Sequence, residues 1–208
     1  MLYQNAVPPT TLELLKKISS IDQLNSFALG GGSNIALRLG HRISVDLDFF
    51  TNNEFDTVQL FHFITKQFSS AELLFEKNQT MLFSVDGIKV DFVLYPFPWL
   101  HSFDRIDGIK LISLPDIIPM KLQAVSTRNA KKDYWDIAAL LRQFSLQEML
   151  KIFKEKFPQI DTGFIIHSLT DFEKADNELD PDTLTHITWQ EIKSQLINEV
   201  RTFTEDSL

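Results

Sequence analysis

The chain has 208 residues, no cysteine and a formal net charge of −8. The absence of cysteine excludes a disulfide framework and a cysteine-based zinc site. The acidity argues against broad wrapping of nucleic acid, which needs many lysine and arginine contacts to phosphates. With 44% hydrophobic residues, the chain can form one large domain or two small ones.

The sequence MLYQNAVPPTTLELL at the N-terminus has no basic region followed by a long apolar core, so we expect no signal peptide. No window approaches the roughly 18 uninterrupted apolar residues of a membrane-spanning helix. We therefore expect a soluble cytoplasmic protein with no membrane partner.

The N-terminal half alternates helical and extended patterns. Thr10 or Thr11 is expected to cap a first helix, in which Leu12, Leu15 and Ile18 share one face. The periodicities predict helices at residues 9–20, 34–39 and 57–68, and strands at 27–29 and 43–50.

A run of strands follows at residues 72–76, 81–85 and 88–95. Asp86-Gly87 separates the last two and is a strong hairpin signal. In the second arm, Asp91 interrupts an otherwise apolar run. Because side chains alternate along a strand, Lys89 and Asp91 should share one face.

The C-terminal half is expected to be helical after a short strand at 109–113. Ser145 with Glu148 forms a capping box for one of these helices. The predicted helices cover 115–126, 131–144, 145–157, 162–172 and 189–203. The fold class is therefore α+β, with a mixed β-sheet and flanking helices in domain 1–108 and a helical bundle in domain 109–208.

The pair Asp46-x-Asp48 is the first candidate for chemistry. Both carboxylates project from the same face of one strand, and such a pair suits a hard divalent cation such as Mg²⁺. The alternative is that Asp46 and Asp48 are solvent-exposed acids of the surface. However, the surrounding SVDLDFF is mostly apolar, and Asp91 adds a third acid from a second strand. Three acids on two adjacent strands are what a two-metal phosphoryl-transfer site requires.

The glycine run Gly30 to Ser33 is the second candidate. A glycine-rich turn before a helix offers N–H groups to a phosphate, and the Ser33 hydroxyl is placed to bind a terminal phosphate oxygen. Alternatively, the glycines only make a turn. The run is neither a Walker loop nor a GxGxxG fingerprint.

The helices at 115–126 and 131–144 contain the remaining candidates. Lys121 lies among apolar residues, where its stem can pack while its amine reaches water. Asp133 lies near a helix start, where a negative charge is favourable. Asp136, one turn later, can pair with Lys132.

Other polar residues give weaker signals. Arg128, Lys131 and Lys132 form a basic cluster that is either a solvated turn or a contact for phosphates or an RNA end. The five histidines have no ligand-like spacing and are interpreted as structural, with His41 a minor candidate for nucleotide contact. Tyr134 and Trp135 are expected to pack in the core.

Taken together, these motifs resemble a known family. Gly32-Ser33, a gap, Asp46-x-Asp48 and a distant third acid resemble the signature of the nucleotidyltransferase superfamily typified by DNA polymerase beta. GGGSNIALRLGHRISVDLDFF resembles the opening motif of the AbiEii/AbiGii toxin family, and PDIIPMKLQAVSTRNAKKDYWDIAALL resembles its second block. The two blocks frame residues 27–141, roughly half the chain.

The resemblance implies a nucleotidyltransferase-like fold and a role for each matching residue. Asp46 and Asp48 would bind metal, and Asp91 would join them as the third acid of the superfamily. Lys121 would contact the triphosphate, and Asp133 would lie near the active centre as a candidate base, with Asp136 a second candidate. The catalytic set is Asp46, Asp48, Lys121 and Asp133, and the nucleotide-binding set is Gly31, Gly32, Ser33, Arg42 and Lys121.

The implied activity is Mg²⁺-dependent transfer of NMP from an NTP, bound in a cleft between the two halves, to an RNA such as tRNA or to a protein. The resemblance also implies a bacterial abortive-infection toxin paired with an antitoxin protein. One alternative is a nucleotide- or partner-binding module of the same fold with little transferase activity. Another is an acidic scaffold that binds no nucleotide.

Overall fold

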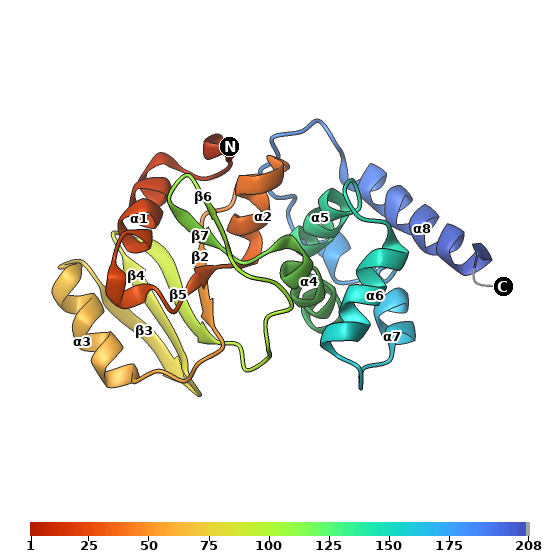
Figure 1. Ribbon diagram of the computed structural model, residues 1–208. Helices are drawn as coiled ribbons and strands as arrows, with labels where there is room; N and C mark the ends of the chain where they lie inside the picture. The colour runs from red at the N-terminus through yellow and green to blue at the C-terminus, as the bar shows by residue number, and fades with distance from the viewer. Residues whose placement is uncertain (207–208) are drawn as a thin grey trace. The chain divides into compact units, whose positions relative to one another are not determined.

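The computed structural model describes residues 1–206, and their contacts divide the chain into two compact units (Figure 1). The first unit comprises Met1–Arg38 and Ser44–Ser113. The second comprises Leu39–Ile43 and the chain from Leu114 onward. The main division therefore falls at Leu114 rather than at residue 109, because residues 109–111 form a strand of the sheet in the first unit.

The first unit is built on a seven-stranded mixed sheet with strand order β3-β4-β5-β2-β1-β7-β6. Its α+β character is as predicted. The two parallel pairs are β2 with β5 and β1 with β7, and the other neighbours are antiparallel. The strands are β1 (Ala28–Leu29), β2 (Leu47–Thr51), β3 (Glu72–Lys77), β4 (Thr80–Val85), β5 (Ile88–Leu94), β6 (Asp104–Ile106) and β7 (Ile109–Leu111).

Two Asp-Gly turns join neighbouring strands. Asp86-Gly87 links β4 to β5 with φ values of 52° and 77°, which confirms the predicted hairpin. Asp107-Gly108 links β6 to β7 with φ values of 52° and 81°. This second hairpin was not predicted, although its turn has the same sequence signal.

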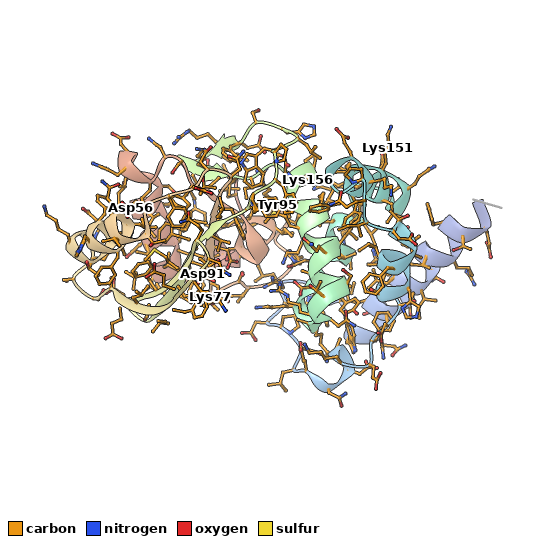
Figure 2. All side chains as sticks on the ribbon, turned by 90° about the horizontal axis from the view of Figure 1, so that it is seen from below. Asp56, Lys77, Asp91, Tyr95, Lys151 and Lys156 are labelled. Carbon is orange, nitrogen blue, oxygen red and sulfur yellow. The ribbon has the colours of Figure 1, made fainter. Side chains whose placement is uncertain are left out.

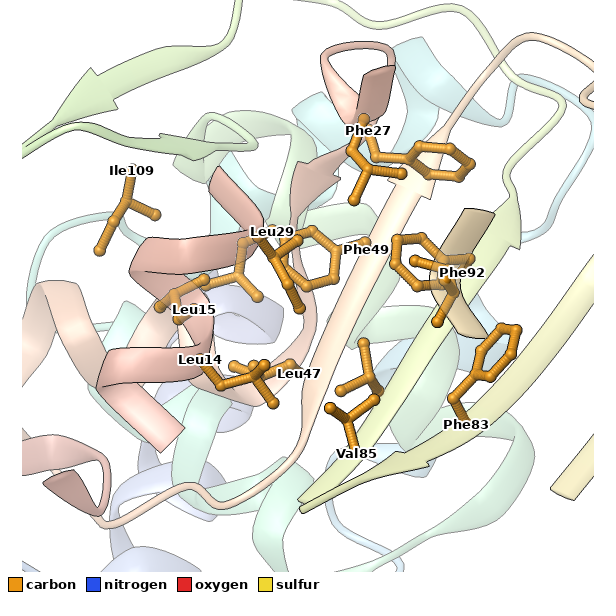
Figure 3. Packing of buried hydrophobic residues seen from close by; sticks show 14 of the residues in the cluster. Leu14, Leu15, Phe27, Leu29, Leu47, Phe49, Phe83, Val85, Phe92 and Ile109 are labelled. Carbon is orange, nitrogen blue, oxygen red and sulfur yellow. The ribbon is translucent and has the colours of Figure 1, made fainter. Parts of the chain in front are cut away.

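One face of the sheet packs into the main hydrophobic core of the first unit (Figure 3). Leu47 and Phe49 of β2 lie beside Val90 and Phe92 of β5, and the Phe49 and Phe92 rings stack with centroids 5.5 Å apart. Helices α1 (Pro9–Ser19) and α3 (Thr57–Gln67) supply Leu14, Leu15, Ile18, Leu60 and Ile64 to this core. The alternate residues of β2 and β5, including Asp48 and Asp91, therefore project from the opposite face.

The start of α1 differs from prediction. The residue preceding α1 is Pro8, which makes no side-chain cap, and Thr11 is buried inside the helix instead of capping it. Proline near the first turn is itself a start signal because its missing N–H would be unbonded there anyway. Helix α3 is capped by Asp56, whose carboxylate accepts a hydrogen bond from Gln59 N at 2.9 Å.

The predicted strand at 43–50 is shorter than expected and begins only at Leu47. Ser44 N donates to Ala6 O at 2.9 Å, so the backbone there bonds the N-terminal segment and not a neighbouring strand. The helix before it, α2 (Gly31–Leu39), begins three residues earlier than predicted. Its first turn therefore contains Gly31, Gly32 and Ser33.

The second unit is helical, as predicted, with α4 packed against α5, α6 and α7. The capping box of Ser145 and Glu148 at the start of α6 is confirmed. Helices α5 and α7 end earlier than expected, at Leu140 and Ser168. The helices are α4 (Leu114–Arg128), α5 (Lys131–Leu140), α6 (Leu146–Lys156), α7 (Thr162–Ser168) and α8 (Trp189–Asp206).

Aromatic side chains hold α5 and α8 together. The Trp135 and Trp189 rings stack with centroids 5.3 Å apart, and Tyr134 meets Trp189 edge to face. Tyr134 and Trp135 are both essentially inaccessible to solvent, which confirms their predicted place in the core.

Candidate active site

The glycine turn lies directly against one carboxylate of the first unit. Gly30 N donates to Asp48 O at 2.8 Å, which ties the turn to β2. Gly31 has a φ of +61°, and a Cβ placed on it would lie only 2.0 Å from Asp48 Oδ2. Residues with side chains rarely adopt this backbone conformation, and none has room here. The glycine is therefore required to let the Asp48 side chain lie over the start of α2.

Ser33 is fully buried in the first turn of α2. Its hydroxyl donates a hydrogen bond to the backbone carbonyl of Asp46. The Ser33 hydroxyl, which we expected to bind a phosphate, thus donates its proton to the backbone. This hydrogen bond fixes the segment that leads into β2. The glycine turn and Ser33 therefore position both acids of the Asp46-x-Asp48 pair.

The third predicted acid lies beside this pair. Asp48 of β2 and Asp91 of β5 are partners in the parallel register, so their Cα atoms are neighbours on the same face. Asp46 precedes Asp48 by two residues and lies just outside the strand. The predicted adjacency of the acidic strands is confirmed.

Asp91 is the most buried of these acids, with 8% of its surface exposed (Figure 2 labels it on β5). Its Oδ2 lies 2.8 Å from Lys89 Nζ. Its Oδ1 is buried and has no hydrogen-bond partner among the described residues. Burial raises the pKa of Asp91, and the negative charges of Asp48 and Asp46 raise it further, although the Lys89 ammonium opposes this. Asp91 Oδ1 therefore offers a ligand atom to a cation.

These acids suit a divalent cation chemically, but they are not gathered into a finished site. Within residues 1–206, no three histidine, aspartate or glutamate side chains are grouped as ligands for a metal ion. Asp91 Oδ2 is instead bound to Lys89. The oxygen donors and the buried, unbonded Asp91 Oδ1 still fit Mg²⁺, which prefers carboxylate ligands.

The second unit contains a separate buried cluster centred on α4 and α5. Lys121 Nζ lies 3.2 Å from Asp133 Oδ1 and 2.6 Å from Asp136 Oδ2. Lys121 is 5% exposed and both acids are fully buried. The amine predicted to reach water or a triphosphate is thus held between two carboxylates.

Asp136 is surrounded by cations and does not pair with Lys132. Arg42 makes a bidentate contact, with Nε 2.8 Å from Oδ1 and Nη2 3.0 Å from Oδ2. His41 Nε2 lies 2.7 Å from Oδ1. Burial alone would raise the pKa of Asp136, but Arg42, Lys121 and His41 hold it well below its usual range. The guanidinium assigned to nucleotide binding is therefore committed to a buried ion pair.

Asp133 is bound by Arg128 at the end of α4. Arg128 Nε lies 2.6 Å from Oδ2 and Nη2 lies 2.7 Å from Oδ1. Burial opposes the charged form, yet Arg128 and Lys121 lower the pKa of Asp133. A carboxylate held in this way is a weak base. Its two oxygens instead fix the position of the Arg128 guanidinium, and the Arg128 side chain is 51% exposed.

Comparison with known proteins identifies the family. The family model described as "Nucleotidyl transferase AbiEii toxin, Type IV TA system" matches residues 13–205. The chain belongs to the AbiEii family. A protein of Aquifex aeolicus (strain VF5), aq_aa25, is 34% identical over 200 residues, which span 93% of this chain and 96% of that protein, and is described as uncharacterized.

Solved structures give the fold of the AbiEii chain. A protein from H. pylori named provisionally as a nucleotidyltransferase has a TM-score of 0.59 at 14% identity and covers 96% of both chains. JHP933 from Helicobacter pylori has a TM-score of 0.52 at 14% identity, with 97% of this chain and 96% of that one covered. The antibiotic-resistance factor ANT(2'')-Ia has a TM-score of 0.53 at 16% identity, covering 70% of this chain and 89% of its own. The predicted nucleotidyltransferase-like fold is thus confirmed.

Sequence reasoning missed several of the contacts in these two clusters of the AbiEii chain. The Lys89 contact had a local signal, because Lys89 and Asp91 are two residues apart on a strand and share a face. The contacts of His41 and Arg42 with Asp136 had no local signal, since about 94 residues separate them along the chain.

Within the described residues, none of the AbiEii helices combines the length and apolar character that crossing a membrane requires.

Proposed function

We propose that this chain is a Mg²⁺-dependent nucleotidyltransferase whose metal and nucleotide phosphates bind on the carboxylate face of the first unit. One observation supports this most: Asp48 and Asp91 are register partners on adjacent strands, and the glycine turn at the start of α2 lies against Asp48. A helix N-terminus attracts phosphate through its N–H groups. The same small region thus offers ligands for both a cation and an anion.

In the proposed reaction, an acceptor oxygen forms a bond to the α-phosphorus of an NTP while the bond to the leaving pyrophosphate breaks. The acceptor's proton passes to a carboxylate of the site. Asp46, Asp48 and Asp91 would hold Mg²⁺, which supplies charge neutralisation at the phosphates. The protein's own contribution is to orient the reactants and to keep these charges in place before reaction.

We also propose that activity requires Lys121 and Asp133 of the second unit. Lys121 is held by two buried carboxylates, and Asp133 holds the half-exposed Arg128. This arrangement favours a positioning role for Asp133 over a role as base. Arg128, a member of the predicted basic cluster, is then a candidate contact for phosphates or an RNA end.

The family description, "Type IV TA system", supports a toxin role with an antitoxin that counteracts it. We propose that the acceptor is an RNA, such as tRNA, or a protein. The net charge of −8 disfavours a long, broadly wrapped RNA and leaves the end of a structured RNA or a protein side chain as the target.

Labelling tests this proposal. The purified chain is incubated with each α-³²P-labelled NTP, Mg²⁺ and either total cellular RNA or cellular protein. Mg²⁺-dependent label on one acceptor pool is expected, and Asp46→Asn or Asp48→Asn should reduce it by about 10³-fold or more. A binding module of the same fold would give no label with any NTP but would keep its NTP-induced thermal stabilisation.

A further inference from the structure

Lys89 contacts Asp91, one of the three acids that are proposed to bind the metal. Its Nζ lies 2.8 Å from Asp91 Oδ2, and its side chain is 43% exposed. The register pairs Leu47 with Val90 and Asp48 with Asp91. Continuing the register by one residue brings Asp46 alongside Lys89, so the ammonium lies in the field of all three acids.

The electrostatics of Lys89 agree with this placement. Its partial burial lowers the pKa, but Asp91, Asp48 and Asp46 more than offset this and raise it above its ordinary value. The ammonium is therefore charged and is stabilised by the same three carboxylates that are proposed to hold a metal.

Asp91 has an unused ligand atom in this arrangement. Its Oδ1 is buried and unbonded among the described residues, while Lys89 occupies only Oδ2. Asp91 therefore keeps one oxygen as a ligand for a metal ion while Lys89 binds the other. A divalent cation bound to Asp91 would repel the ammonium at close range.

We propose that Lys89 is a built-in counter-cation that binds Asp91 in the metal-free protein and is displaced from it when a divalent cation binds. Lys89 thereby sets the metal concentration that the site requires. The inference rests on the proposed function, because it assumes that Asp46, Asp48 and Asp91 form the metal site. Lys89 acts through Asp91 and is a positioning residue rather than a catalytic one.

Metal binding without turnover tests this inference. The full chain is titrated with Mg²⁺ and, separately, with Mn²⁺ at constant ionic strength and without nucleotide. Thermal stabilisation reports binding of either metal, and loss of the free-ion electron paramagnetic resonance signal reports Mn²⁺. The variants are Lys89→Met, the polar replacement Lys89→Gln as a second variant in case the first folds poorly, and the control Lys66→Met. Lys66 is an exposed lysine of α3, which packs on the other face of the sheet, so its loss changes net charge equally.

We expect both Lys89 variants to half-saturate at roughly tenfold lower metal concentration than the wild type, because a competing charge has been removed. Lys66→Met should match the wild type. Equal or weaker metal binding by the Lys89 variants, with normal binding by the wild type, overturns the role of Lys89 and leaves the proposed function intact. If no form binds either metal, both the inference and the proposed metal site are wrong.

Discussion

Gly31 and Asp48 are in direct contact across the start of α2, since a Cβ on Gly31 would lie 2.0 Å from Asp48 Oδ2. The strand that bears Asp48 and the turn that offers N–H groups therefore pack closely against each other. Ser33 stabilises this junction by donating a hydrogen bond to the Asp46 carbonyl. The turn thus acts first as the support of the acidic pair.

Gly31→Ala should be strongly destabilising. The new methyl group would collide with Asp48, and the residue would also be strained at a φ of +61°. Gly108→Ala is a matched control, because Gly108 has a φ of +81° and a Cβ there would meet no atom within 4 Å. We expect roughly 1–2 kcal/mol for the control from backbone strain alone and about 3 kcal/mol or more for Gly31→Ala. Urea unfolding measures both, and equal losses would show that the contact with Asp48 is unimportant.

Arg42→Met should destabilise the second unit. Removing the guanidinium leaves the fully buried Asp136 without its bidentate partner. Breaking a buried pair from one side costs about 3–5 kcal/mol. The control is Arg142→Met on the exposed end of the α5 region, where a change within about 0.5 kcal/mol is expected. A loss of unfolding free energy no greater than that of the control would mean that Arg42 does not form the ion pair with Asp136 in solution.

Asp136 should contribute stability that depends on pH. Its pKa is well below the ordinary value in the folded chain, so the unfolded state takes up a proton first as the pH falls. The contribution is therefore fully present above about pH 4, the unfolded pKa, and declines as the pH falls toward the folded pKa. In urea unfolding, Asp136→Asn should be less stable than the wild type at pH 7, with a smaller difference at pH 3. A difference that grows on acidification would contradict this.

Asp91→Asn should have the opposite effect on stability at pH 7 from Asp136→Asn. Burial and the neighbouring acids raise the pKa of Asp91, so the folded state favours its protonated form. That stabilisation is present below about pH 4 and is lost as the pH rises through the folded pKa, whereas asparagine stays neutral throughout. The variant should be more stable than the wild type at pH 7 and nearly equal at pH 3, while losing transfer activity. A variant less stable at pH 7 would show that the Lys89 ion pair outweighs the repulsion.

The local features of this chain were largely predictable. The hairpin at Asp86-Gly87 and the capping box at Ser145 follow from signals a few residues long, and both are confirmed. The adjacency of Asp48 and Asp91 followed from two apolar strands that each carry an acid. The second hairpin, at Asp107-Gly108, had the same signal and was overlooked.

Contacts between distant segments were not predictable in the same way. Helix α2 ends at Leu39, and Gly40 turns the chain with a φ of 60° just before Arg42. Arg42 then bonds Asp136 in the second unit. Lys121 and Asp133 were assigned from resemblance, and nothing near them in sequence indicates that Lys121 is enclosed by two carboxylates.

The most direct test of the central claim is the position of the metal. Crystals grown with Mn²⁺ and a non-hydrolysable NTP analogue would locate the ion by its anomalous scattering. We expect a peak in contact with carboxylate oxygens of Asp46 and Asp48, at roughly 2.0–2.3 Å, with the phosphates near the first turn of α2. A nucleotide bound with its metal elsewhere, away from both acids, would contradict the account.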